Sequence, residues 1–99
     1  MKIFHIVPAQ KWREALEFGI YRADSLETEG FIHCCTEEQV PAVRDVWFAG
    51  VTDLLLVEID PQLLTVDLKY EDSHHNGELF PHLYGPLNLD AVSRVTVCQ

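Results

Sequence analysis

The run "LLLVEI", Leu54–Ile59, constrains the fold more than any other part of the chain. It is apolar at almost every position, which is typical of a strand covered on both faces. Such a strand lies in the middle of a sheet and needs partner strands on both sides. A chain of 99 residues is long enough for one domain built around this sheet, and we assign residues 1–99 to it.

Candidate partner strands occur on both sides of this run. "KIFHIV" at residues 2–7 alternates and is rich in β-forming residues, whereas "SRVTVC" at residues 93–98 closes the sheet. "TVDLKYE" at residues 65–71 resembles an edge strand. "LFPHLYG" at residues 79–85 contains Pro81, which cannot donate to a ladder, so we expect it at an edge or beside a bulge.

Two helices are expected in the N-terminal half. The first follows Pro8, with Trp12, Ala15 and Leu16 on its buried face, and ends at Gly19. Between this helix and the next strand we expect a short extended piece and a polar loop. Two helices with six or seven short strands predict an α+β fold rather than a wound parallel sheet.

The second helix has a clear start signal. Thr36 precedes two acidic residues, and Gln39 stands three positions later in capping-box spacing. The helix is predicted to end at Gly50. Its predicted buried stripe consists of Val40, Val43, Trp47 and Phe48.

The chain carries a net charge of −9, from sixteen acidic and seven basic residues. Such a balance disfavours nucleic acid, because phosphates must be neutralised by clustered Lys and Arg. It leaves room for a small anionic ligand held by one local basic pocket. No apolar run approaches a membrane span or a signal peptide. We therefore expect a cytoplasmic protein with a small-molecule ligand and neither nucleic acid nor membrane as partner.

The stretch "GFIHCCT" at residues 30–36 combines one imidazole with two thiols. Strand alternation places Phe31, His33 and Cys35 on one face and Cys34 on the other. Both thiols therefore cannot join His33 on one metal, and a zinc site would need remote ligands. The remote candidates are His74, His75 and His82. No ligand spacing supports such a site, and we expect no metal.

A cysteine nucleophile is also disfavoured. Cys35 and His33 share a strand face but lie about 7 Å apart, too far for a direct hydrogen bond. Three cysteines cannot all pair within one chain, and the adjacent Cys34 and Cys35 would bridge only through a strained ring. We expect Cys34, Cys35 and Cys98 to be reduced, small apolar core residues.

Three histidines lie within separate predicted strands: His5, His33 and His82. Phe80 and Tyr84 share a face with His82, so this row is either core or a flat surface on which a planar ring stacks. Three strand histidines favour a shared polar cleft, with three independent core histidines as the alternative. In a shared cleft, at least one histidine should have a pKa below the usual ~6.5.

Three segments together resemble a known family. "FHIVPAQKW", "DSLETEGFIHCCTEEQ" and "GELFPHLYGPLNLDAV" resemble the bacterial family called domain of unknown function 952. The resemblance covers nearly the whole chain in the same order, and "GFIHCCT" and "FPHLYGPL" are specific together. The name of the family does not indicate a substrate.

The fold of this family is similar to that of ADP-ribosyltransferases and RNA 2′-phosphotransferases. The similarity implies a small split, strongly bent, mixed β-sheet whose cleft holds a dinucleotide, with NAD as a candidate cofactor. In the transferases a first-strand histidine contacts a ribose, a tyrosine stacks on nicotinamide and a late glutamate orients the acceptor. By position, His5 matches the first of these, His33 stands in place of the tyrosine, and Glu78 is the candidate late acid.

The chain departs from the phosphotransferases in its arginines, none of which lies in the two diagnostic motifs. The favoured hypothesis is therefore a non-catalytic module whose His- and Tyr-lined cleft binds a nucleotide-like or small aromatic ligand. The alternatives are an enzyme of the ADP-ribosyl-transfer type and a metal-binding or redox protein that uses His33, Cys35 and His82. The candidate catalytic residues are His5, His33, Glu78 and His82. The candidate ligand-binding residues are Ser25, Phe31, His33, Phe80, His82, Tyr84 and Gly85.

Overall fold

The computed structural model describes all residues from Met1 to Gln99. Its helices are α1 (Ala9–Phe18), α2 (Asp24–Thr28) and α3 (Val40–Trp47), and 3-10 turns occupy Glu37–Gln39, Pro61–Leu63 and Leu89–Ala91. Its strands are β1 (Ile3–Pro8), β2 (Ile20–Tyr21), β3 (Ile32–His33), β4 (Leu54–Ile59), β5 (Asp67–Glu71), β6 (Phe80–Tyr84), β7 (Leu87–Asn88) and β8 (Val92–Val97). No helix combines the length and the apolar character needed to cross a membrane.

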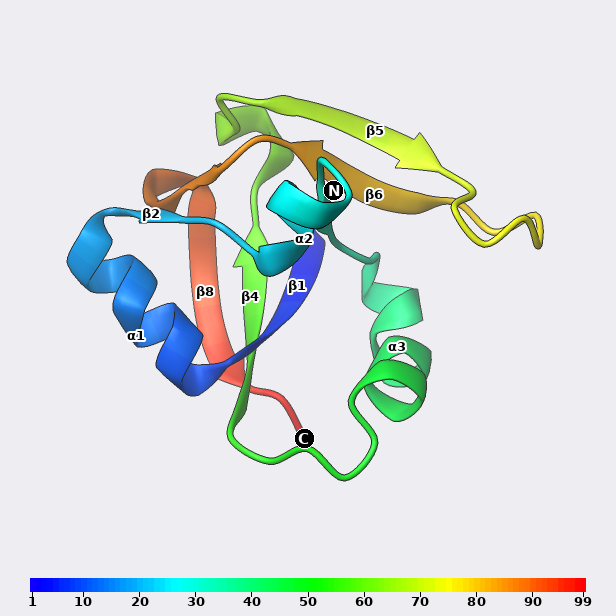
Figure 1. Ribbon diagram of the computed structural model, residues 1–99, viewed down its shortest axis with the longest axis horizontal. Helices are drawn as coiled ribbons and strands as arrows, with labels where there is room; N and C mark the ends of the chain where they lie inside the picture. Colours follow the sequence, from blue (N-terminus) through cyan, green and yellow to red (C-terminus); the bar gives the residue numbers. More distant parts are fainter.

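The strands form three separate sheets, with the orders β1-β4-β8, β2-β7 and β3-β6-β5. Every pairing is antiparallel, so the sheets are not mixed in the sense that we expected. In Figure 1 the strands β5 and β6 run across the top of the upright strands β1, β4 and β8. The predicted α+β class and the central position of β4 are both confirmed.

Pro81 explains where the sheets divide. The prediction that its strand lies at an edge is wrong, because β6 pairs with β3 on one side and β5 on the other. The Cys34 N–H donates to the Pro81 carbonyl at 3.0 Å, but proline has no N–H to return. The β3 ladder therefore ends at His33, and Cys35 instead exchanges two 2.8 Å hydrogen bonds with Phe4 of β1.

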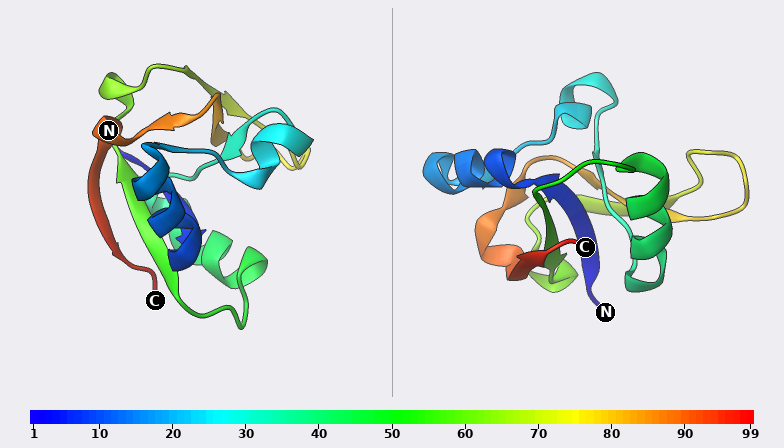
Figure 2. Two further views of the ribbon diagram at one scale, coloured as in Figure 1. Left: turned by 60° about the vertical axis from the view of Figure 1, so that its left-hand side comes forward. Right: turned by 90° about the horizontal axis from the view of Figure 1, so that it is seen from below.

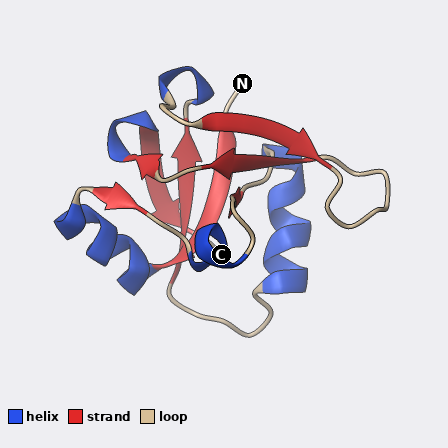
Figure 3. Cartoon of the chain, turned by 45° about the horizontal axis from the view of Figure 1, so that its top comes forward, coloured by secondary structure: helices blue, strands red, loops and turns tan.

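The two faces of β1 contact different parts of the core, as the alternation predicts. Ile3 and Val7 belong to the larger buried cluster, whereas Ile6 belongs to a smaller one beneath α3. Figure 2 accordingly shows α1 and α3 on opposite sides of β1, and Figure 3 shows α3 beside the upright sheet. The larger cluster consists of Ile3, Val7, Trp12, Ala15, Tyr21, Ile32, Cys34, Val57, Ile59, Leu83, Leu87 and Ala91.

The helix α1 packs through a narrower stripe than the sequence predicts. Trp12 and Ala15 are buried, but Leu16 is 57% exposed, so its predicted burial is wrong. Only one line of side chains along this short helix reaches the core. The predicted end is confirmed, because the left-handed Gly19 donates its N–H to the Ala15 carbonyl at 2.8 Å.

The start of the second predicted helix is also confirmed. Thr36 and Gln39 form the capping box, and the Thr36 N–H donates to Gln39 Oε1 at 2.9 Å. Val43 and Phe48 pack against the smaller cluster. Trp47, however, is 62% exposed, so its predicted burial is wrong. Its side chain leaves the cluster side of α3 and faces a cavity instead.

Candidate functional site

A cavity of about 280 Å³ lies between β1, the β3 segment, α3 and the loop after β5. The ring-bearing side chains of its lining are those of Trp47, Phe48, Phe80, His5, His33 and His74. Glu29 is the only charged residue of the lining apart from histidine, and no Lys or Arg contributes to it. The cavity is therefore a largely aromatic space with one carboxylate.

One wall of the cavity is a chain of three rings. Trp47 stacks on His74 with ring centroids 5.5 Å apart and planes 27° apart. His74 in turn meets Phe80 edge to face at 5.9 Å. The sequence predicts a solvated turn at His74 and a core position for Trp47, so it misses both as lining residues. No spacing in the sequence relates these two residues, because a loop and a helix bring them together.

His5 lies at the inner end of the cavity with both ring nitrogens bonded. Nδ1 lies 2.6 Å from the His33 carbonyl, which can only accept, so Nδ1 carries the proton. Nε2 then accepts from the Tyr21 hydroxyl at 2.8 Å. Burial lowers the pKa of His5 to about 4, outweighing the rise due to the His33 carbonyl. A lowered histidine pKa was expected, but its main cause is burial rather than repulsion within a shared cleft.

His33 is half-exposed at the opening of the cavity. Its Nε2 lies 3.1 Å from Glu29 Oε2, an acidic partner that sequence analysis does not identify. His33 is paired directly with His82 across β3 and β6, at a position where the backbones exchange no hydrogen bond. Side chains approach closely at such positions, and the two imidazoles meet edge to face at 5.4 Å.

His82 is buried, with 1% of its surface exposed, and belongs to a polar cluster on β5 and β6. Its Nδ1 donates to Glu71 Oε1 at 2.8 Å, and the Tyr84 hydroxyl donates to the same oxygen. The hydrogen bonds from Tyr84 and His82 hold the pKa of Glu71 below its usual value. The hydrogen bond between Tyr84 and Glu71 also raises the pKa of Tyr84. His82 Nε2, by contrast, is buried without any hydrogen-bond partner.

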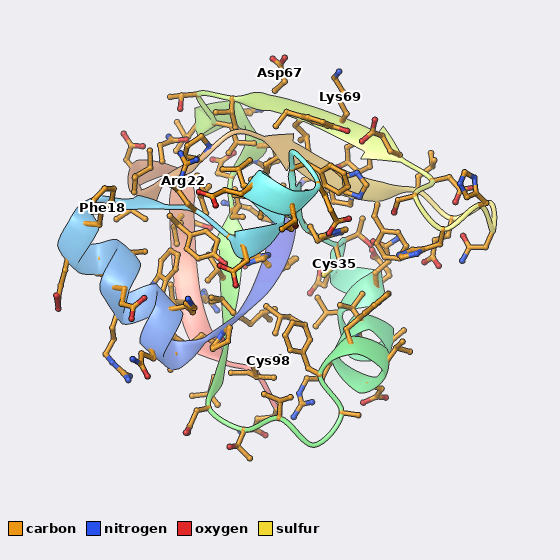
Figure 4. All side chains as sticks on the ribbon, viewed as in Figure 1. Phe18, Arg22, Cys35, Asp67, Lys69 and Cys98 are labelled. Atoms are coloured by element: carbon orange, nitrogen blue, oxygen red, sulfur yellow. The ribbon has the colours of Figure 1, made fainter.

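The Lys69 ammonium lies 4.9 Å from the centroid of the Tyr84 ring. In Figure 4 the side chains of Lys69 and Asp67 project outward from β5. The side chains of Glu71, His82 and Tyr84 share this outward face, because the β5–β6 pairing joins Lys69 to His82 and Asp67 to Tyr84. This cluster therefore lies on the side of its sheet away from the larger core.

Phe31 covers the row of Phe80, His82 and Tyr84, which the sequence leaves open as either core or a stacking platform. Its ring stacks on His82 at 4.0 Å and 18°, and lies 4.8 Å from His33 and 5.5 Å from Tyr84. The Ser25 hydroxyl donates to the Phe31 carbonyl at 2.7 Å. Ser25 lies in α2, where the sequence predicts a loop. In this structure the platform is thus occupied by a side chain of the protein itself.

The remaining predicted site residues lie away from the cavity. Glu78 is exposed, and its Oε2 accepts from the Gln39 amide at 3.1 Å. Gly85 approaches Val66 so closely that an added Cβ would lie 2.5 Å from Val66 Cγ1, which gives this glycine a packing reason. The structure therefore brings His5, His33 and Phe80 to the cavity and places His82, Tyr84 and Phe31 in the adjoining ring cluster.

The three cysteines are free and buried, as expected from the sequence. Burial raises the pKa of Cys35 to about 12 and raises those of Cys34 and Cys98 as well. Such thiols stay protonated and are poor nucleophiles. Figure 4 labels Cys35 and Cys98 inside the molecule. No group of three or more His, Cys, Asp or Glu side chains is arranged to hold a metal ion.

The fold and this site define a small α+β protein with an aromatic cavity at the division between two sheets. Residues 6–95 match the family described as "Protein of unknown function (DUF952)", and the chain belongs to that family.

The chain is also similar to protein CC0527 from Caulobacter crescentus. The X-ray structure of that protein is 33% identical, with 98% of this chain and 85% of that chain covered and a TM-score of 0.89. Its solution NMR structure is 33% identical, with 97% and 83% covered and a TM-score of 0.83. No curated protein matches the chain.

Proposed function

We propose that this protein is a binding module whose cavity takes one small planar aromatic ligand, neutral or cationic. The observation that carries the proposal is the lining: three aromatic side chains and three imidazoles surround a space with a single carboxylate. Ligand pockets are typically apolar and aromatic, with a few polar groups that orient the ligand. At about 280 Å³ the cavity suits one ring system rather than a dinucleotide.

The charge of the lining selects among nucleotide-like ligands. Phosphate groups are bound by Lys, Arg or clustered backbone N–H groups, and no basic side chain except histidine lines the cavity. Glu29 would repel a phosphate and attract a cation, and the faces of Trp47 and Phe80 attract cations as well. The ligand we propose is therefore the ring portion of a nucleotide-like molecule, such as a nicotinamide-type ring, without its phosphates.

Hydrogen bonding at the opening comes from the pair formed by His33 and Glu29, which lie 3.1 Å apart. His5 contributes shape rather than hydrogen bonds, since both of its nitrogens are already bonded within the protein. We expect the protein in the cytoplasm, because its three free thiols fit a reducing compartment.

A second candidate is an ADP-ribosyl-transfer enzyme that uses NAD. It is favoured by the position of the cavity, which lies at a sheet division beside the first-strand His5, as the family resemblance implies for a dinucleotide cleft. Glu78, the candidate late acid, lies outside the cavity lining and would have to move to act there.

Titration with nicotinamide, 1-methylnicotinamide and NAD, followed by NMR, tests the proposal. We expect 1-methylnicotinamide to bind best, NAD to bind no better than nicotinamide, and Glu29→Gln to remove the preference for the cation. Trp47→Ala should weaken binding by about threefold to tenfold, as expected for one lost ring contact. Phe18→Ala is the matched control, because Phe18 is exposed on α1 away from the cavity.

The two candidate functions give different results in this assay. Tight NAD binding with release of nicotinamide, lost in His33→Ala, would replace the binding module by the transferase. Absence of any shift at Trp47 with all three compounds would contradict both.

A further inference from the structure

The charge at the opening of the cavity depends on two side chains, Glu29 and His33. Glu29 is the only acidic residue of the lining, and no Lys or Arg contributes to it. Glu29 Oε2 lies 3.1 Å from His33 Nε2. Histidine is the side chain whose charge ordinarily changes between about pH 5 and 8. The net charge of the pair therefore follows the protonation of His33.

The two protonation states of His33 leave Glu29 in different situations. A carboxylate only accepts hydrogen bonds, so the neutral ring donates to Glu29 from Nε2 and takes up a second proton on Nδ1. Beside the neutral ring, the opening carries the full negative charge of Glu29, whose Oε1 has no partner within the protein. Beside the protonated ring, the same contact is an ion pair with no net charge.

The other titratable groups around His33 do not change the charge of the cavity in this pH range. His5 donates from Nδ1 to the His33 carbonyl, and burial lowers the pKa of His5 to about 4, so its ring stays neutral. The two thiols that follow His33 stay protonated, because burial raises their pKa values. His82 meets His33 edge to face but lies outside the cavity lining, with its Nδ1 bonded to Glu71.

His74 is the other lining imidazole that reaches solvent. It stacks on Trp47 and meets Phe80 edge to face, and no carboxylate is bonded to it. A proton on His74 would add positive charge to the cavity wall, whereas a proton on His33 forms an ion pair with the one carboxylate. His74 is therefore the competing source of any pH dependence.

We propose that His33 determines the ligand charge that the cavity prefers: beside neutral His33, Glu29 attracts a cationic ring, and protonated His33 pairs with Glu29 and removes that preference. This inference rests on the proposed function and adds the regulation of the same site. The side chains of His33 and Glu29 are 43% and 50% exposed, so water and salt weaken their interactions. We therefore expect a graded effect of about threefold to fivefold in relative affinity.

Nicotinamide and 1-methylnicotinamide suit the test, because neither changes its own charge between pH ~7.5 and ~5.5, where histidine titrates. Their affinities are measured by NMR at both pH values for the wild type, His33→Gln and His75→Asn. The matched control is His75→Asn, because His75 is exposed on the loop of His74 but lies outside the lining. Dispersed amide signals at both pH values establish that each variant is folded.

In the wild type and in His75→Asn, the preference for 1-methylnicotinamide should fall about threefold to fivefold at the lower pH. In His33→Gln the preference should be the same at both pH values. The glutamine amide can still donate to Glu29, but it takes up no proton.

Linkage gives a second readout that needs no variant. If a proton on His33 weakens binding of the cation by some factor, the cation weakens binding of that proton by the same factor. Saturating 1-methylnicotinamide should therefore move the midpoint of the His33 NMR titration to lower pH, by about 0.5–0.7 pH unit for a threefold to fivefold effect. Nicotinamide should move the midpoint much less.

A preference for the cation that is independent of pH in the wild type would overturn the inference and leave the cavity proposal standing. A pH response that persists in His33→Gln and disappears in His74→Asn would assign it to His74 and would also overturn the inference. Absence of binding by both compounds at both pH values would contradict the proposed function and, with it, this inference.

Discussion

His5 and His82 are the two buried histidines of the protein, and they differ in whether both ring nitrogens are hydrogen-bonded. Each has Nδ1 bonded to an oxygen, the His33 carbonyl for His5 and the Glu71 carboxylate for His82. Nε2 of His5 accepts from Tyr21, whereas Nε2 of His82 has no partner. The imidazole of His5 is therefore fully hydrogen-bonded within the protein, whereas that of His82 keeps one buried nitrogen without a partner.

The difference follows from the sheet faces on which the two rings lie. His5 is enclosed between β1, β3 and Tyr21, which belongs to the larger core cluster. His82 lies on the opposite face of the β3-β6-β5 sheet, covered by the partly exposed ring of Phe31. An unpaired polar atom costs more inside a packed core than beneath one partly exposed ring, where local opening gives the atom access to water.

The largest expected effect is the difference in free energy of unfolding between variants of the two histidines. His5→Leu leaves the His33 carbonyl and the Tyr21 hydroxyl without their partner, so we expect a loss of about 2–4 kcal/mol in the free energy of unfolding. His82→Leu removes one hydrogen bond to a partly exposed carboxylate together with an unpaired nitrogen, and should change stability by less than about 1 kcal/mol. Urea unfolding of both variants measures this, and equal losses would end the distinction.

A somewhat smaller effect concerns pH. The pKa of His5 is about 4 in the folded protein and about 6.5 in the unfolded chain, so the unfolded chain binds the proton first as pH falls. The contribution of neutral His5 is complete above pH ~6.5 and is lost as the pH falls towards 4. Between pH 7.5 and 5.0 we expect a loss of about 2 kcal/mol from this residue.

Urea unfolding of the wild type and His5→Leu at these two pH values isolates that contribution. The lowered pKa of Glu71 acts in the same direction but at lower pH: its contribution is present above the unfolded pKa of the carboxyl and is lost as the pH falls through the folded pKa. The chosen pH range therefore stays above most of the carboxylate titration. An identical pH dependence in both proteins would show that the pKa of His5 is not lowered on folding.

The smallest expected effect comes from making His5 resemble His82. Tyr21→Phe removes the hydroxyl that donates to His5 Nε2 and leaves that nitrogen buried and unpaired, at a cost of about 1–2 kcal/mol. Tyr84→Phe is the matched control, because its hydroxyl donates to Glu71 on the exposed side of the sheet, and its effect should be much smaller. A larger loss in Tyr84→Phe than in Tyr21→Phe, measured by urea unfolding, would reverse our assignment of roles.

The sequence predicts the main elements well where the signal is local. Leu54–Ile59 is the central strand β4, the capping box at Thr36 is present, and Gly19 ends α1. These features depend on the apolar pattern or on residues within one turn of each other. The position of Pro81 is different, because the sequence does not say which neighbouring strand its missing N–H faces. It faces Cys34, just beyond the end of the two-residue β3, so a proline is tolerated in a middle strand.

The candidate site shows the same division. The sequence predicts His33, Phe80, His82 and Tyr84 as site residues, because alternation places aromatic and imidazole side chains on one strand face. It misses Glu71, Trp47 and His74, since their contacts join strands, a helix and a loop that lie far apart in the chain. Phe31 is predicted to contact a ligand, whereas in the structure its ring stacks on His82.

The sequence by itself determined the α+β class, most of the strands and the family, because these depend on local patterns that a single chain carries in its residue order. Only the tertiary structure decided that His5 is satisfied and His82 is not. Hydrogen bonds of buried side chains depend on which distant residues meet, and here those residues are Tyr21, His33 and Glu71. The physical reason is that pairing of polar atoms is set by three-dimensional proximity, which the strand pattern alone does not specify.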